Sequence, residues 1–188
     1  MKSLISFMAA MAVAAAAQAA PVTYVIDNAH TFPRFGYSHM GYSMQQSRFD
    51  KTSGTIILDR EARTGRAEIR IDARSVSTGV PALNDVIQTE DFFNTKKYPE
   101  ILFTSNDFQF DGEKLVALNG QLTIKGVTRP ATLNVTSFKC MPNPMDKKDT
   151  CGANAVAVLK RSDFNMGKYA PQVSDEVALN IAVEAVRK

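Results

Sequence analysis

Strict alternation of apolar and polar residues is the feature of this sequence that most restricts its fold. Over residues 66–74 the positions Ala67, Ile69, Ile71 and Ala73 share one parity, and charged residues occupy the other. Such a segment forms a β-strand with one buried and one solvated face. The same pattern predicts strands over Thr23–Asp27, Phe32–Tyr42, Gly54–Asp59, Ile101–Phe110, Lys114–Lys125, Ala131–Phe138, Ala153–Arg161 and Val177–Val186. The chain is therefore predicted to be all-β, with about nine strands.

Short turns separate the predicted strands. Residues 63–65, 111–112 and 125–126 each include a glycine, which adopts the positive φ of tight turns at little cost. Consecutive antiparallel hairpins are then the simplest topology. Because no helical layer is predicted to cover the apolar face, the strands must pack as a sandwich or close into a barrel.

The first nineteen residues are typical of a secretory signal peptide. Lys2 precedes an apolar run from Leu4 to Ala17, and residues 17–19 form a small-x-small cleavage site. A membrane anchor needs about twenty strongly apolar residues, whereas this run is shorter and rich in alanine. We therefore expect cleavage after Ala19, a mature domain over residues 20–188 and a periplasmic location.

The charge balance argues against a polyanionic partner. The chain has 22 Lys and Arg against 19 Asp and Glu, and the formal net charge of +3 falls to +2 when Lys2 is removed. The basic residues alternate with acidic ones, whereas nucleic-acid-binding proteins carry a clustered basic face. We expect no nucleic-acid partner.

Two cysteines, Cys140 and Cys151, enclose a segment rich in proline and charge. In an exported protein this arrangement predicts a structural disulfide, whose closure is worth about 3 kcal/mol in the chain-entropy model. A redox-active pair is disfavoured because the spacing is not C-x-x-C and no basic group is placed to lower a thiol pKa. Neither His30 nor His39 lies at a metal-ligand spacing, so we expect no metal site.

One helix is predicted within residues 80–93. Pro81 suits a helix start, and Leu83, Val86 and Ile87 recur at a three-to-four spacing. A Tyr-Pro dipeptide further on forces an extended exit into the next strand. The helix is short and single, so it can only cover one end of the strand assembly.

Several motifs occur together in a characteristic order. Residues 91–93 read DFF, residues 98–99 read YP, and residues 120–130 read GQLTIKGVTRP. In this combination the chain resembles the YceI-like family from about Tyr24 to the C-terminus. The resemblance implies an antiparallel up-and-down, lipocalin-like β-barrel with one short capping helix, which holds a long isoprenoid lipid in its apolar interior.

One part of the family pattern is missing. Many relatives carry an R-D-x-H-L-like cluster before DFF, where residues 82–87 of this chain read ALNDVI. If the missing arginine and histidine contact a ligand headgroup in relatives, this chain is expected to take a less anionic or differently shaped head. A quinone in place of a phosphate is one such head.

Other positions match the family one by one. Asp27 with His30, His39 with the Met-Gly that follows it, Arg161 with the Asp and Phe after it, and residues 174–177 (SDEV) fall on family motifs. Asp27, Arg161 and the aspartate of SDEV can be explained by hydrogen bonding or ion pairing at strand ends. His39 is either a half-buried core residue or a ligand contact.

Alternate residues of a closed barrel point inward, so parity groups the candidate lining residues without fixing which face is inward. A lining that lacks Trp and includes Phe and Met is soft and adaptable. The predicted ligand-binding residues are Phe35, Tyr37, His39, Leu83, Val86, Ile87, Phe92, Phe93, Ile101, Phe103, Leu122, Ile124 and Met166.

The leading functional hypothesis is lipid carriage without catalysis, as periplasmic transport or storage of a polyprenyl lipid or a ubiquinone-like quinone. Burial of each CH₂ group contributes about 0.8 kcal/mol, so several isoprene units offset an association cost of about 4–15 kcal/mol with few polar contacts. We expect no cofactor besides the lipid, transient contact with a membrane or membrane protein, and a monomer or homodimer.

The alternative hypothesis is an enzyme or stress-response protein that acts on such a lipid, with Tyr37, His39 or Asp85 as general acid–base groups. No Ser-His-Asp order, paired carboxylates or phosphate-binding loop in the sequence supports it. A purely structural adhesin would instead have a filled core and an exposed apolar patch.

Overall fold

Eleven strands dominate the computed structural model, which describes residues 20–188. The predicted signal peptide lies outside the described residues. The strands are β1 (Val22–Ile26), β2 (Phe32–His39), β3 (Ser43–Phe49), β4 (Thr52–Asp59), β5 (Thr64–Asp72), β6 (Val76–Ser77), β7 (Glu100–Asp111), β8 (Lys114–Ile124), β9 (Val127–Pro142), β10 (Asp149–Lys160) and β11 (Glu176–Arg187). The helical elements are the 3-10 helices η1 (Asn28–His30), η2 (Ala73–Ser75) and η3 (Arg161–Phe164) and the α-helix α1 (Pro81–Ile87).

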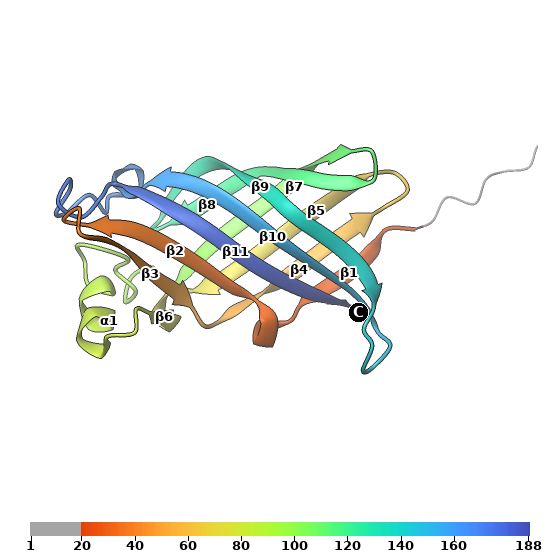
Figure 1. The fold of residues 1–188 in the computed structure, drawn as a ribbon, viewed down its shortest axis with the longest axis horizontal. Helices are drawn as coiled ribbons and strands as arrows, with labels where there is room; N and C mark the ends of the chain where they lie inside the picture. The colour runs from red at the N-terminus through yellow and green to blue at the C-terminus, as the bar shows by residue number, and fades with distance from the viewer. Residues whose placement is uncertain (1–19) are drawn as a thin grey trace, which may run out of the picture.

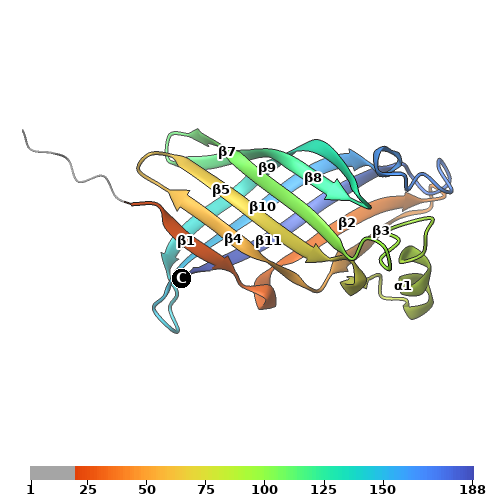
Figure 2. The ribbon, with the colours of Figure 1, turned by 180° about the vertical axis from the view of Figure 1, so that it is seen from behind.

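The strands close into an antiparallel barrel. Pairing runs in the order β1, β4, β5, β7, β8, β9, β10, β11, and β11 pairs back to β1. At one end of the barrel, β2, β3 and β6 continue the strands β1, β4 and β5. There β2 pairs with β11, β3 pairs with β2, and β6 pairs with β3. Neighbours in this eight-membered ring follow one another along the chain, apart from the closing pair and the pairs β1–β4 and β5–β7, between which β2, β3 and β6 lie. The predicted all-β, up-and-down barrel is confirmed (Figures 1 and 2).

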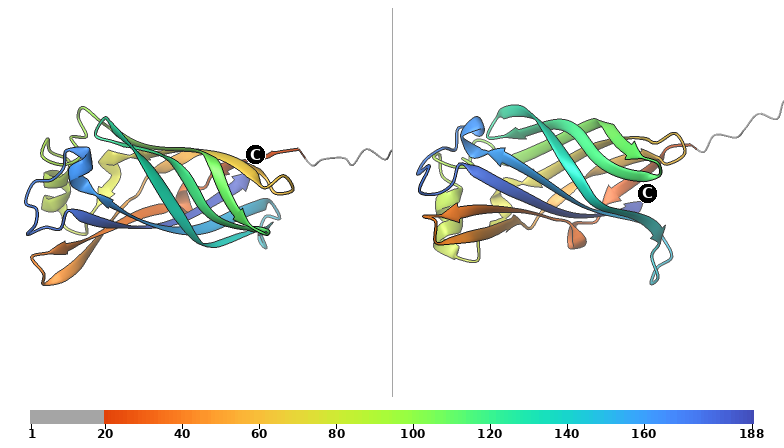
Figure 3. Two further views of the ribbon diagram at one scale, coloured as in Figure 1. Left: turned by 90° about the horizontal axis from the view of Figure 1, so that it is seen from above. Right: turned by 45° about the horizontal axis from the view of Figure 1, so that its top comes forward.

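Polar turns divide two of the long strands into segments. Between β1 and β2 the carboxylate of Asp27 accepts a hydrogen bond of 2.9 Å from the amide of Ala29 and begins η1. Between β3 and β4 the amides of Asp50 and Lys51 both donate to the hydroxyl of Ser75, at 3.2 and 3.0 Å. Beyond these breaks the β2–β3 hairpin projects from one end of the barrel (Figure 3).

The sequence prediction missed β3 and β6. Most side chains of β3 are exposed, so its sequence lacks the alternation that marks a half-buried strand. β6 has two residues, too few for a pattern. The strand predicted over residues 32–42 ends at His39 because Met40 and Gly41 take positive φ, 51° and 74°, in the turn to β3.

The helix is also shorter than predicted. Pro81 occupies its first turn as expected, but α1 ends at Ile87 and not near residue 93. The amide and the hydroxyl of Thr89 both donate to the carbonyl of Val86, at 3.0 and 2.7 Å, which replaces the next helical turn by a tighter one. Within residues 20–188 no helix has the length and apolar character needed to span a bilayer.

The interior of the barrel is filled at one end, here called the packed end. Its buried residues are Tyr24, Ile26, Leu58, Ala67, Phe108, Leu115, Cys151 and Ala185. Tyr24 is 1% exposed, and its hydroxyl donates a hydrogen bond of 2.8 Å to the carboxylate of Asp149. Side chains therefore close the barrel at this end. A second cluster of buried residues lies toward α1.

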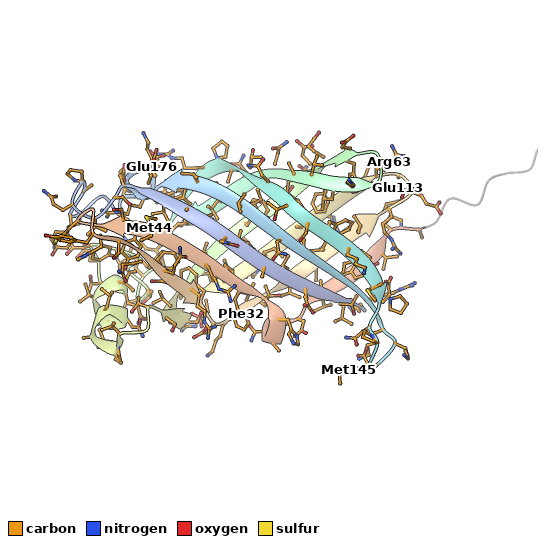
Figure 4. The ribbon with its side chains drawn as sticks, in the orientation of Figure 1. Phe32, Met44, Arg63, Glu113, Met145 and Glu176 are labelled. Carbon is orange, nitrogen blue, oxygen red and sulfur yellow. A yellow bond between two sulfur atoms is a disulfide. The ribbon has the colours of Figure 1, made fainter. Side chains whose placement is uncertain are left out.

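Cys140 and Cys151 form the predicted disulfide. The two residues are directly paired in the ladder between β9 and β10, so the bond links two strands that already share a register. The hairpin loop beyond them includes Met145, which projects past the packed end in Figure 4.

Candidate ligand-binding cavity

The other half of the barrel contains a cavity of about 350 Å³, within the range of roughly 300–1,000 Å³ that is usual for small-molecule sites. Inward-facing residues of β2, β5, β7, β8 and β11 form its walls. α1 and two further stretches, residues 88–99 and residues 161–175, surround its mouth, and we call these two stretches the mouth segments. Leu83, Val86 and Tyr169 both line the cavity and are exposed, so the cavity reaches solvent between α1 and the mouth segments.

All thirteen residues predicted to bind a ligand line this cavity. They are Phe35, Tyr37, His39, Leu83, Val86, Ile87, Phe92, Phe93, Ile101, Phe103, Leu122, Ile124 and Met166. The closed barrel shows which face of each strand points inward, which parity alone had left open. For example, Leu122 and Ile124 point inward and are 7% and 6% exposed. Their contact with a ligand stays a prediction.

Sixteen further lining residues were not predicted. Most occupy inward-facing positions of strands that alternation had identified, so the same parity would have named them. The others flank the bends near η1 and β4 or lie in the second mouth segment, where there is no alternation. The sixteen are Thr31, Pro33, Arg34, Phe49, Thr52, Ile69, Ile71, Leu133, Leu159, Arg161, Tyr169, Val173, Val177, Leu179, Ile181 and Val183.

Three aromatic rings fix the first mouth segment to the barrel wall. The ring centroid of Phe93 lies 6.1 Å from that of Phe35 and 5.4 Å from that of Phe49, with both contacts edge to face. Phe35 and Phe49 are themselves 5.4 Å apart. Each such pair contributes about 0.5–1.5 kcal/mol beyond the burial of its area. This wall of the cavity therefore forms without help from a ligand.

Two lysines join the mouth segments. The ammonium of Lys125 donates hydrogen bonds of 2.7 Å to the carbonyls of Glu90 and Asn165, one in each segment. Lys168 forms an ion pair with Asp91, and the hydrogen bond to that carboxylate raises the pKa of Lys168. Both of these lysines are thus already bound to protein acceptors.

Arg161 is a buried cation that organises the second mouth segment. It is 7% exposed, and burial lowers its pKa. Its guanidinium donates to four backbone carbonyls of this segment, those of Met166, Lys168, Val173 and Ser174. Asp175 accepts from the amide and hydroxyl of Ser162, at 2.8 and 2.6 Å. The structural interpretation of Arg161 and Asp175 is confirmed.

The three candidate acid–base groups do not come together. Tyr37 and His39 line the cavity, but Asp85 lies on the exposed side of α1 and is not part of the cavity wall. A catalytic proton transfer needs its donor and acceptor within hydrogen-bond reach of the same substrate atom. This arrangement does not provide that for Asp85.

Asp27, His30 and Glu184 gather outside the cavity, where the sequence predicted no ligand cluster. Nδ1 of His30 lies 2.7 Å from a carboxylate oxygen of Asp27, and ligand atoms of all three side chains lie within 4.8 Å of one another. The hydrogen bond between them lowers the pKa of Asp27 and raises the pKa of His30. These side chains are of the type that holds a divalent cation, and in the structure Asp27 and His30 form an ion pair with each other.

A second hollow, of about 690 Å³, lies on the outer surface over β5, β7 and β8. Exposed polar side chains such as Glu68, Asp107 and Gln121 line it. It encloses no apolar surface comparable to the interior cavity, so the interior cavity is the candidate site.

Comparison with known proteins identifies the family of the barrel. Residues 24–185 match the model of the YceI-like domain. The chain belongs to the YceI-like family. Protein YceI of Escherichia coli O157:H7 is 33% identical over 190 residues, which cover 100% of this chain and 98% of that protein. The resemblance drawn from the DFF, YP and GQLTIKGVTRP motifs is confirmed.

Solved structures share the YceI-like barrel. BcnA of Burkholderia cenocepacia superposes with a TM-score of 0.71 at 27% identity, over 85% of this chain and 98% of BcnA. A polyisoprenoid binding domain from Saccharophagus degradans superposes with a TM-score of 0.67 at 20% identity, over 89% of this chain and 99% of that domain. The second likeness shows the fold alone.

Proposed function

We propose that this YceI-like protein binds a long-chain isoprenoid lipid, either a polyprenyl lipid or a ubiquinone-like quinone, in the barrel cavity. The observation that carries the proposal is the cavity itself, which is lined almost throughout by aliphatic and aromatic side chains and opens at one end. The similar fold of the polyisoprenoid binding domain from Saccharophagus degradans supports this class of ligand.

The apolar lining supplies enough free energy for such a ligand. Each buried CH₂ contributes about 0.8 kcal/mol, and association costs about 4–15 kcal/mol. Several isoprene units therefore suffice with few polar contacts. A purely structural protein would have a fully packed barrel. The cavity argues against that alternative.

Three cations at the mouth are held by protein groups, which favours a neutral headgroup. A phosphate headgroup is usually held by cations that are free to pair with it. Here Lys125 donates to two backbone carbonyls, Lys168 is paired with Asp91, and Arg161 is bound by backbone carbonyls. The quinone alternative, which the missing R-D-x-H-L cluster indicated, agrees with this arrangement better than a polyprenyl phosphate.

We further propose that binding serves transport or storage in the periplasm and involves no chemical change of the lipid. The signal-peptide pattern and the disulfide between Cys140 and Cys151 support an exported protein. Asp85 lies outside the cavity that Tyr37 and His39 line, so the three candidate acid–base groups do not form one site, which supports binding without catalysis.

Native mass spectrometry of protein purified from the export compartment, followed by organic extraction, tests the proposal. We expect a stoichiometric long-chain isoprenoid lipid that dissociates unchanged. Recovery of fatty acids or phospholipids alone would contradict the ligand class. Incubation of the protein with the recovered lipid, followed by mass analysis of the lipid, tests the enzyme alternative, which requires a change of mass.

A further inference from the structure

Exposed apolar side chains gather around the cavity mouth. Among the residues that the structure describes, thirteen large hydrophobic residues are exposed, and seven of them belong to the elements that surround the mouth. They come from the β2–β3 hairpin, from α1 and the residue before it, and from the second mouth segment, three regions that lie together in all views (Figures 1–3). The seven, here called the mouth rim, are Met40, Tyr42, Met44, Val80, Leu83, Val86 and Tyr169.

The stretches that carry six of the seven mouth-rim residues, all but Val86, lack charge. Residues 37–47, 76–84 and 169–174 contain no Asp, Glu, Lys or Arg, although these make up 22% of the chain. Charge resumes at Asp85, beside the rim. A surface that leaves water on docking is expected to have this composition, because burial of an unpaired charge costs far more than burial of a hydroxyl or amide.

The opposite end of the barrel has the reverse character. Its turns read DREAR at residues 59–63, DGEK at residues 111–114 and DKKD at residues 146–149. Figure 4 shows Arg63 and Glu113 at that end and Met44 at the mouth end. Exposed apolar residues also occur at the packed end, as with Met145 at 91% exposure, but there they lie among charges. Within residues 20–188 the mouth end carries the larger group of exposed apolar residues, and the charges next to it include the ion pair of Lys168 with Asp91.

The mouth rim is continuous with the cavity lining. Leu83, Val86 and Tyr169 belong to both, so apolar surface runs without interruption from outside the barrel into the cavity. An apolar chain that moves along this surface stays out of water.

We propose that the mouth rim docks on the surface of a lipid bilayer, and that the isoprenoid lipid passes directly between the bilayer and the cavity. This inference rests on the proposed function and names the source of the ligand. Tyr42, 86% exposed, and Tyr169, 56% exposed, have the amphipathic rings that are enriched at membrane–water interfaces. Met40 and Met44 supply flexible apolar side chains beside them.

The depth of docking is limited by β3. This strand pairs with β6 at Arg48 and Phe49, whereas residues 43–47 pair with β2 alone among the described strands. The outer edge of residues 43–47 thus has backbone groups that need water or polar headgroups. The rim therefore inserts its side chains into the interfacial layer and does not enter the hydrocarbon core.

Cosedimentation of the mature protein with phosphatidylcholine vesicles tests the proposal. We expect the wild type to bind these neutral vesicles and to stay bound in about 0.5 M NaCl, since an uncharged rim is insensitive to screening. Met40→Asp combined with Met44→Asp should lower the partition coefficient at least about tenfold, because a charge is costly in a membrane. Met145→Asp, at a methionine of the packed end that is still more exposed than Met40 and Met44, is the control and should change binding by less than about twofold. Circular dichroism checks that all variants keep the β fold.

Three results would overturn the docking proposal. One is wild-type binding that requires phosphatidylglycerol and disappears in salt. Another is a double variant that binds vesicles as the wild type does. The third is light scattering that shows a wild-type dimer and a monomeric double variant, without vesicle binding by either, since the rim would then contact a second copy of the chain.

The experiments keep this proposal separate from the proposed function. Protein that carries isoprenoid lipid but never sediments with vesicles contradicts docking alone. Protein that binds vesicles through the rim yet yields no isoprenoid lipid contradicts the proposed function alone.

Discussion

Lys168 and Asp91 form an ion pair that joins the two mouth segments beside the opening of the cavity. Both side chains are about half exposed, and such pairs add little to global stability. The segments they connect nevertheless border the opening through which a ligand would pass. The pair is therefore placed to affect the rate of ligand exchange more than the stability of the fold.

Asp91→Asn should accelerate ligand exchange a few-fold and leave the melting temperature nearly unchanged. Exchange is measured by mixing loaded protein with isotope-labelled lipid and following mass over time. Asp146→Asn, which removes the ion pair with Lys148 at the packed end, is the control and should not alter exchange. High salt should accelerate the wild type but not the Asp91→Asn variant. Equal rates for wild type and variant at low salt would refute this role.

Leu122→Trp should keep the melting temperature within a few degrees and abolish retention of the lipid. Leu122 borders the cavity, so the larger ring fills space that the ligand needs and adds apolar contact to the protein. Gln121→Trp, on the exposed face of the same strand, should leave lipid retention intact. If Leu122→Trp instead lost the roughly 1–3 kcal/mol typical of an overfilled core and still held lipid, the space beside Leu122 would not be the ligand site.

Cys140→Ser with Cys151→Ser should destabilise the fold without impairing binding. Loss of a bond that closes a loop of this size costs about 3 kcal/mol, or roughly 6–12 °C in melting temperature for a chain of this length. The bond lies at the packed end, away from the cavity, so lipid retention well below the melting temperature should match the wild type. Binding lost by a folded variant would show that the two ends are coupled.

Arg161→Met should destabilise the protein by about 3 kcal/mol, because it leaves several buried carbonyls without a donor. Arg161→Lys should recover part of the loss, since an ammonium donates to fewer of the spread carbonyls than a guanidinium does. Hydrogen exchange should show the largest change in residues 161–175. If Arg161→Met left the hydrogen-exchange protection of this segment unchanged, the role assigned to Arg161 would be contradicted.

The pair Asp27–His30 should make a small contribution to stability that depends on pH. Hydrogen bonding to Asp27 raises the pKa of His30 above its ordinary 6.5, so its contribution is complete below pH 6.5 and is lost as pH rises through the raised value. The same bond lowers the pKa of Asp27 below its ordinary 3.8, so its contribution is complete above that pH and is lost as pH falls through the lowered value. The pair therefore contributes fully between these two ordinary pKa values.

An NMR titration of His30 checks this pair. Asp27→Asn should return the pKa of His30 toward 6.5. Glu184→Gln should have a smaller effect, since Glu184 acts on His30 through charge alone. A His30 pKa that does not change in Asp27→Asn would show that another group sets it.

The alternation in the sequence was sufficient to assign residues to one face of a strand where the two faces differ in environment. On β5 and β8 one face meets the interior and the other meets water, so Ile69, Ile71, Leu122 and Ile124 could be assigned to one face from the sequence. β3 is wet on both faces over most of its length, and no alternation remains to reveal it.

Contacts between distant segments lay beyond the sequence. The carbonyls that bind Arg161 are backbone groups, which every residue has, so no residue type marks them. Glu184 approaches Asp27 and His30 because β11 pairs with β1, a relation that a single sequence leaves open. The length of α1 depended on a turn at Thr89 that competes with helix continuation.

The packed end has a consequence for kinetics. Tyr24 and its neighbours block the barrel at one end, so a ligand enters and leaves the cavity through the same opening. The part of the ligand that enters first therefore leaves last. A second molecule cannot displace the first from behind. Exchange must then follow the departure of the occupant, and its rate should not depend on the concentration of the incoming lipid. A lipid chain longer than the cavity leaves its remaining units outside the barrel. The cavity therefore limits the length of lipid that is sheltered from water, and it does not limit the total length of the lipid.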